Sequence, residues 1–227
     1  MELLLPRVVA PARILPSYVK LDMAFGVGAG TTLYDKSRYR SHGAIVGADW
    51  AAGLHGYALN FTPSNFDHVE IPAAKTQLNF TSGKFSIVMR VRFDSFAGNP
   101  ILFQRGWWNT DGYQFYALST GRLFIYTYQA AANQSSNTVA GTLVTATWYT
   151  LGLSRNGASI RLFINGIDRT AGTGTHVAPL TSARSAKIGI SDDLISSPLD
   201  AKMEFLRIFG GVALSASEQL AWHNALK

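Results

Sequence analysis

The stretch "RNGASIRLFINGIDRT", residues 155–170, contains two Asn-Gly pairs nine residues apart, with an almost continuous apolar segment between them. Asn-Gly suits a two-residue type I′ turn because both central residues take a positive φ, which glycine adopts freely and asparagine tolerates. Such turns join neighbouring antiparallel strands. We therefore predict one strand over residues 147–155, a second over 159–165 and a third that begins at residue 166.

The composition favours an all-β fold. Among 227 residues there are 21 Gly, 13 Phe, 9 Tyr and 5 Trp, and short apolar runs alternate with Gly, Asn, Ser and Thr. Roughly ten to twelve short strands at this spacing predict an antiparallel two-sheet jelly-roll sandwich. We expect one sandwich domain over residues 19–227, preceded by an extended arm over residues 1–18 that is interrupted by three prolines. The arm either packs along its own domain or docks on a neighbouring subunit.

Three further segments carry local signals. In residues 85–93 Phe85, Ile87, Met89, Val91 and Phe93 alternate with Ser86, Val88, Arg90 and Arg92, which predicts a strand with one core face and one face toward water or a partner. Residues 26–53 and 130–141 are predicted to be polar loops. Ser215 and Glu218 fit a capping box, which predicts a short C-terminal helix.

The composition argues against disulfides, thiolate metal sites, a membrane span and a nucleic-acid surface. The absence of cysteine excludes disulfides and thiolate metal sites. The N-terminal apolar stretch lacks a basic start and is broken by proline, so it predicts neither a signal peptide nor a membrane span. The net charge is +6, but the densest basic group, Lys36, Arg38 and Arg40, is only three charges long. That scattering does not indicate a nucleic-acid surface.

Four segments in order resemble the concanavalin A-like lectin/glucanase superfamily, and within it the laminin G-like jelly rolls. They are "HGYALNFTPSNFDHVEIP" (55–72), "FSIVMRVRFDS" (85–95), "WYTLGLSRNGASIRLFINGI" (148–167) and the closing "KIGIS…MEFLRIFGGVALSASEQ" (187–219). The resemblance covers about residues 20–227 and implies the same two-sheet sandwich.

The sequence predicts no enzyme. The glucanase branch of the resembled superfamily carries an E-x-D-x-x-E motif, since retaining hydrolysis needs two carboxyl groups about 5 Å apart. This chain has only Glu2, Glu70, Glu204 and Glu218, and none has a second glutamate nearby. Asp67 and Glu70 would point to opposite sides of a strand and are predicted to be a surface pair. The five histidines show no metal-ligand spacing.

One loop is a candidate ligand site. The residues with suitable side chains in "RGWWNTDGYQF" are Trp107, Trp108, Asn109, Asp111 and Tyr113. Aromatic faces beside amide and carboxylate groups suit a sugar or a protein partner. The alternative is that one tryptophan caps the core and the other shields a sheet edge.

No cofactor or metal is predicted. Laminin G-like domains sometimes hold a rim calcium with acidic loop residues, and the resemblance raises Asp111, Asp192, Asp193 and Asp200 for that role. No specific motif supports calcium, and solvated turn acids are the simpler interpretation.

The sequence leaves two main functions. The first is a structural or assembly protein, because a jelly roll with an apolar arm looks like phage and viral proteins that decorate a capsid or build tail appendages. This hypothesis places the chain in a virion, with other subunits of the same or another protein as partners through the arm. The alternative is a glycan-binding lectin module for surface attachment, served by the Trp107 and Trp108 loop.

Overall fold

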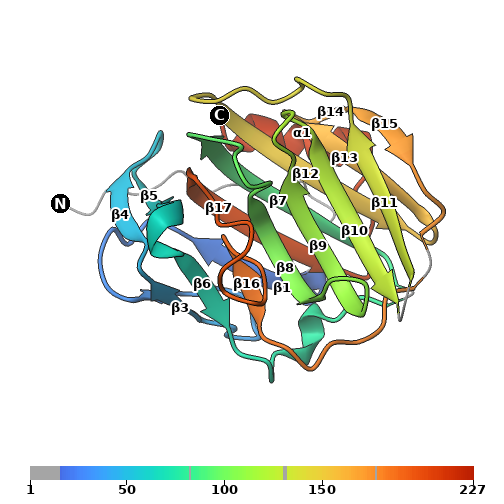
Figure 1. Cartoon of the computed structure of the whole chain (residues 1–227), viewed down its shortest axis with the longest axis horizontal. Helices are drawn as coiled ribbons and strands as arrows, with labels where there is room; N and C mark the ends of the chain where they lie inside the picture. The colour runs from blue at the N-terminus through green and yellow to red at the C-terminus, as the bar shows by residue number, and fades with distance from the viewer. Residues whose placement is uncertain (1–15, 82, 130–131, 177) are drawn as a thin grey trace.

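The computed structural model describes residues 16–81, 83–129, 132–176 and 178–227. It consists of two antiparallel sheets packed face to face, with one C-terminal α-helix, as the sequence predicts (Figure 1). Of the expected arm, only residues 16–18 are described, as the 3₁₀ turn η1 (Pro16–Tyr18); the rest of that prediction lies outside the described residues. Within the described ranges no helix has the length and apolarity needed to cross a membrane.

In the described part of the chain, the first sheet has eight strands and the second has nine. Strands of the first sheet are, in spatial order, β14 (Ile167–Asp168), β13 (Ser159–Ile164), β12 (Trp148–Asn156), β7 (Phe85–Phe93), β17 (Ala201–Gly210), β5 (Tyr57–Phe61) and β4 (Asp49–Ala52), with β1 (Val19–Ala24) paired to β17. Those of the second are β15 (Thr170–Thr173), β11 (Ala132–Thr138), β10 (Leu123–Gln129), β9 (Asp111–Ala117), β8 (Ile101–Trp107), β16 (Ala186–Ile188), β6 (His68–Ile71), β3 (Gly43–Val46) and β2 (Thr32–Leu33). The remaining elements are η2 (Pro63–Asn65), η3 (Thr76–Leu78) and α1 (Ala216–Ala225).

The predicted meander is present, but its two turns differ. In the second, Ile164 pairs with Ile167, and Asn165 and Gly166 have φ of +53° and +76°, the type I′ geometry that the sequence predicts. The first turn corrects the prediction, because Asn156 pairs with Ser159. The central residues are therefore Gly157 and Ala158, of which only the glycine has a positive φ, of +61°. That pattern fits a type II′ turn, which needs glycine only at its first central position.

The core lies between the two sheets. The five predicted inward residues of β7, Phe85 to Phe93 at every second position, are completely buried. From the second sheet the inward residues of β9 and β10 meet them, among them Phe115, Leu123 and Ile125. Each fully buried side chain of this size stabilises the fold by about 1.5–3 kcal/mol.

The opposite face of β7 is not open, which corrects the sequence prediction. Val88 is completely buried in a second apolar cluster with Phe205, Phe209 and Trp222, and Trp222 comes from α1. The predicted capping box is confirmed: the Ser215 side chain accepts from the backbone N–H of Glu218, whose carboxylate reaches back. The helix thus covers a face that the strand pattern alone assigned to water or a partner.

Two predicted loops contain strands. Residues 26–53 include β2, β3 and β4, and residues 130–141 include β11, which lies between β10 and β15. The inward residues of β11 are polar and have polar partners. Ser136 contacts buried His176 (2.9 Å), which also contacts Thr127 (2.8 Å). A strand with polar residues on both faces has no apolar alternation to reveal it. Short strands of this kind raise the number within the described residues to seventeen.

Candidate functional site: an aromatic face on the second sheet

Trp107 and Trp108 lie at the tip of the hairpin that joins β8 to β9. The backbone N–H of Thr110 donates to the Trp107 carbonyl oxygen (3.1 Å), and the Asp111 carboxylate accepts from the Trp107 N–H (2.8 Å). Asn109 takes a left-handed φ of +55°, which asparagine tolerates. These contacts close a tight turn that holds both indole rings at one end of the second sheet.

The two glycines that flank this turn occupy positions where a larger residue would not fit. Gly106 and Gly112 have φ of +109° and +73°. A Cβ atom on Gly112 would lie 1.8 Å from the Arg105 carbonyl oxygen, so no other residue fits there without moving the backbone. The turn geometry therefore depends on glycine at this position.

Trp108 is exposed at the hairpin tip, with 49% of its surface accessible. Its ring packs edge-on against two tyrosines of β10, at 5.1 Å from Tyr126 and 5.5 Å from Tyr128 between ring centroids. Edge-to-face contacts of this kind fix the orientation of a ring. One side of the indole is thus held by the sheet, and a large part of the ring remains open to a ligand.

Trp108 belongs to a continuous group of rings on the outer side of the second sheet. We call this group the aromatic face; it consists of Trp108, Tyr116, Phe124, Tyr126 and Tyr128. Its members from β10 occupy every second position, opposite the core residues Leu123 and Ile125. Apart from Trp108 only Tyr126 is appreciably accessible, and the other three rings form the buried base beneath them.

A row of amide and hydroxyl side chains runs beside the rings on β11. Asn133, Ser135 and Asn137 pair in register with Tyr128, Tyr126 and Phe124, so both sets share one face of the sheet. Asn133 is exposed and the other two polar residues are half-buried. The Asn133 amide also donates to the Asn109 side-chain oxygen (3.2 Å), which links this row to the hairpin tip.

The aromatic face is uncharged. Burial, followed by the influence of the neighbouring tyrosines, raises the pKa of Tyr116 and Tyr128 above the usual value of a phenol, so both stay neutral. Among the described residues of β9, β10 and β11, the outward positions of the aromatic face and the amide row hold neither a carboxylate nor a cation. Hydrogen bonding and ring stacking are therefore the interactions that this surface offers.

The structure separates the predicted site residues. Trp107 contacts a different part of the chain from Trp108: its ring lies 5.5 Å from the Arg184 guanidinium. Asp111 uses its carboxylate to hold the turn. Trp108 and Asn109 are the two predicted residues that lie beside the amide row.

Tyr113 is a correction to the predicted site. Its side chain is 1% exposed, and its hydroxyl donates to the Leu78 carbonyl oxygen (3.1 Å) inside the core. Arg105 and Tyr113 are register partners on the inward side of β8 and β9. Tyr113 therefore supports the hairpin from beneath and cannot contact a ligand on the aromatic face.

The carboxylates considered for catalysis each contact a different group of the fold. Asp67 is buried, which corrects its prediction as a surface residue, and it accepts from the Thr62 N–H (2.8 Å). Glu70 accepts from the Ser185 hydroxyl (2.7 Å), and Glu204 lies 3.2 Å from the Arg90 guanidinium. Each of these acids therefore has a structural partner of its own.

Three of the four loop acids considered for calcium, Asp111, Asp192 and Asp193, have hydrogen-bond partners. Asp192 accepts from Arg184 (2.6 Å) and Lys187 (2.7 Å), while Asp193 holds its own loop through Ser196. Burial raises the pKa of Asp200. In the described part of the chain, no group of three or more His, Cys, Asp or Glu side chains is placed to hold a metal ion.

The fold and the sequence identify the family. The sequence profile of a laminin G-like family, described as "Concanavalin A-like lectin/glucanases superfamily", matches residues 63–218, more than half of the chain. The chain therefore belongs to the concanavalin A-like lectin/glucanase superfamily. No curated protein sequence matched it.

Solved structures share the fold at low identity. The binding domain of Paraclostridial Mosquitocidal Protein 1 is 12% identical with a TM-score of 0.72; the match covers 94% of this chain and 53% of that one. Domain 4 of AbnA, an extracellular arabinanase from Geobacillus stearothermophilus in complex with arabinotriose, is 16% identical with a TM-score of 0.67. That match covers 90% of this chain and 98% of the arabinanase domain. The binding domain of Botulinum neurotoxin DC in complex with SialylT is 13% identical with a TM-score of 0.69, and the match covers 93% of this chain and 52% of that one. This chain thus spans about half the length of the toxin binding domains.

Proposed function

We propose that this chain is a non-catalytic glycan-binding domain and that its aromatic face binds neutral sugar units. The observation that carries the proposal is the half-exposed Trp108 ring, held in place by Tyr126 and Tyr128 beside the amide row of β11. A pyranose or furanose ring has an apolar face that stacks on an aromatic ring, and hydroxyl groups at its edge that bond to amides. Both kinds of partner are present within one sheet surface.

The absence of charge from this surface indicates the kind of sugar. A carboxylate or sulfate group would find no cation at the outward positions of β9, β10 and β11 that the structure describes. Neutral hydroxyl groups can instead bond to Asn133, Ser135 and Asn137. Domain 4 of AbnA, of which the match covers 98%, was solved in complex with arabinotriose, so a sandwich similar to this one carries a glycan ligand, which supports the proposal.

A glycan array tests this function. The wild-type chain is expected to bind a set of neutral oligosaccharides, and the Trp108→Ala, Tyr126→Ala double variant is expected to lose that binding. Tyr57→Ala is the matched control, because Tyr57 is 51% exposed but lies on β5 in the other sheet. Silence of the wild-type chain across a broad array, or equal binding by the double variant, would refute the proposal.

The virion hypothesis stays a prediction. It depended on an arm over residues 1–18, of which the structure describes only residues 16–18. No contact in the described residues favours assembly over glycan binding. A second function is therefore not proposed.

A further inference from the structure

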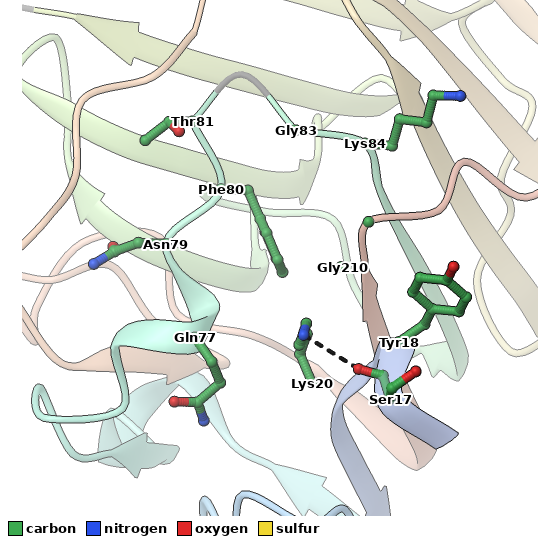
Figure 2. Close-up of a pocket in the computed structure, with 11 residues that line it drawn as sticks. Ser17, Tyr18, Lys20, Gln77, Asn79, Phe80, Thr81, Gly83, Lys84 and Gly210 are labelled. Carbon is green, nitrogen blue, oxygen red and sulfur yellow. Dashed lines mark hydrogen bonds between the residues drawn. The ribbon is translucent and has the colours of Figure 1, made fainter. Parts of the chain in front are cut away.

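A second surface of different chemistry lies at the start of β7 and the end of β17. A hollow of about 390 Å³ lies between η1, the segment that follows η3 and the Gly210–Gly211 backbone. Figure 2 shows the residues that line it. Volumes of this order suit a small ligand. The hollow is remote in sequence from the hairpin tip and shares no residue with the aromatic face.

Glycine keeps this hollow open. A Cβ atom on Gly210 would lie 2.8 Å from Lys20 Cε and 2.9 Å from Phe80 Cε1. At the same place the Phe80 ring is stacked on Phe85 at 4.7 Å between centroids, which fixes an apolar floor. Lys20 and Phe80 thus keep their positions because no side chain is present at residue 210.

The charged groups of the hollow are both lysines. Lys20 Nζ donates to the Ser17 carbonyl oxygen (3.2 Å) and to the Tyr39 hydroxyl (2.9 Å), and an ammonium group has a third hydrogen to donate. Lys84 stands at the rim with an exposed, flexible side chain. Among the described residues no carboxylate lines the hollow, and neither lysine forms an ion pair with an acid.

The positive charge extends beyond the hollow through Tyr39. Its hydroxyl also accepts from Arg38 (2.7 Å), and its carbonyl oxygen accepts from Lys75 (3.0 Å). Arg38, an exposed member of the densest basic group of the sequence, is therefore connected to Lys20 through the Tyr39 hydroxyl.

Asp22 and Asp35, the acids of the neighbouring segments, do not pair with Lys20 or Lys84, since their oxygens have other partners. Asp22 binds Arg207 through both oxygens, at 2.9 and 2.6 Å. Asp35 is buried and accepts four hydrogen bonds, from the backbone N–H groups of Asp22, Ser37 and Ser41 and from the Ser37 hydroxyl. The basic surface is left to attract an anion from solution.

We propose that this hollow binds a sulfate or phosphate ester on a ligand of hexose size. Lys20 and Lys84 hold the oxyanion, and the Phe80 floor contacts the apolar part of the ligand. The two esters share one chemistry, a multivalent oxyanion that lysine binds as a point charge. This site is independent of neutral-sugar binding by the aromatic face.

Titration followed by NMR or calorimetry tests the site on the full chain. The probes are glucose 6-sulfate, glucose 6-phosphate and, as the uncharged control, glucose. The wild-type chain is expected to bind at least one ester, with affinity that falls as salt is added. Binding of one ester alone supports the proposal and identifies the oxyanion.

Variants locate the binding. Lys20→Gln with Lys84→Gln is expected to weaken ester binding by about tenfold or more, as for other close charge contacts. Lys227→Gln, which removes one lysine charge from a residue outside the hollow, is expected to leave ester binding unchanged. If the double variant does not fold, Lys84→Glu serves instead, because that side chain is exposed.

Three results would overturn the proposal. They are no ester bound by the wild-type chain at about 20 mM, far above the usual range of specific ligands, equal binding of the esters by the lysine variants, and equal binding of glucose and the esters by the Trp108→Ala, Tyr126→Ala variant. The Trp108→Ala, Tyr126→Ala variant separates the two sites. It is expected to bind the esters normally, so failure of the neutral-glycan proposal leaves this one standing.

Discussion

Replacement of Trp108 by alanine probes the aromatic face through a single exposed ring. A tryptophan side chain offers up to about 250 Å² of surface. Since Trp108 is 49% exposed, about 120 Å² is accessible, and a sugar ring stacked on one side covers about half of it. At about 25 cal/mol per Å², losing that contact costs about 1.5 kcal/mol.

The expected result is a Kd about tenfold higher for the best glycan of the array. Isothermal titration calorimetry measures this directly, with Tyr57→Ala as the control for a lost exposed ring. The free energy of unfolding of both variants, from urea denaturation, checks that the domain remains folded. A Kd unchanged within twofold in Trp108→Ala would show that the ring does not stack on the ligand and would refute the reasoning.

Three other perturbations follow from buried contacts. Burial, followed by the charge of Arg155, lowers the pKa of His176 to about 4. In the unfolded chain this imidazole takes up a proton below about pH 6.5, whereas in the folded chain it stays neutral. The free energy of unfolding should therefore fall by about 1 kcal/mol from about pH 7.5 to about pH 5.5. Urea denaturation across this range should show a shallower fall in His176→Gln, and an identical slope would contradict the assignment. Trp222→Ala should lower the free energy of unfolding by about 3–5 kcal/mol, because the ring is fully buried against the first sheet; a loss below about 1 kcal/mol would show that α1 contributes little. Gly112→Ala should lower the temperature of thermal unfolding more than Gly157→Ala, because a Cβ atom at residue 112 would clash with the backbone while one at residue 157 meets open space. Equal decreases would mean that the positive φ alone causes the destabilisation.

Local chemistry was sufficient to predict elements whose signal is complete within the strand or turn itself. Alternation in residues 85–93 identified the core face of β7, and Ser215 with Glu218 identified the start of α1. The Asn165–Gly166 turn has the predicted geometry. The turn at Asn156 does not, because pairing of the flanking strands moved it by one residue. Register is a property of two strands together, and a dipeptide does not determine it.

Covering elements and polar strands could not be predicted in the same way. Val88 lies on the face of β7 opposite the main core, but α1, more than a hundred residues later, buries it. Strand β11 is polar on both faces and becomes a strand because β10 and β15 lie on either side of it. Without β11 in the prediction, the amide row beside the rings could not be recognised.

The candidate site was located in part. The hairpin tip with Trp108 was identified, yet Tyr113 was assigned to the same surface although it points into the core. Alternation of Tyr113 with Phe115 already carried the signal for that inward direction. The same period in Phe124, Tyr126 and Tyr128 could have revealed the rest of the aromatic face.

The crystal structure of the chain with the tightest-binding neutral oligosaccharide from the array tests the central claim most directly. We predict that one sugar ring stacks on Trp108 at van der Waals distance, about 3.5–4 Å, while its hydroxyl groups bond to Asn133 or Asn137. A sugar bound at any other place on the domain, with the Trp108 ring uncovered, would contradict the assignment of the aromatic face as the glycan site.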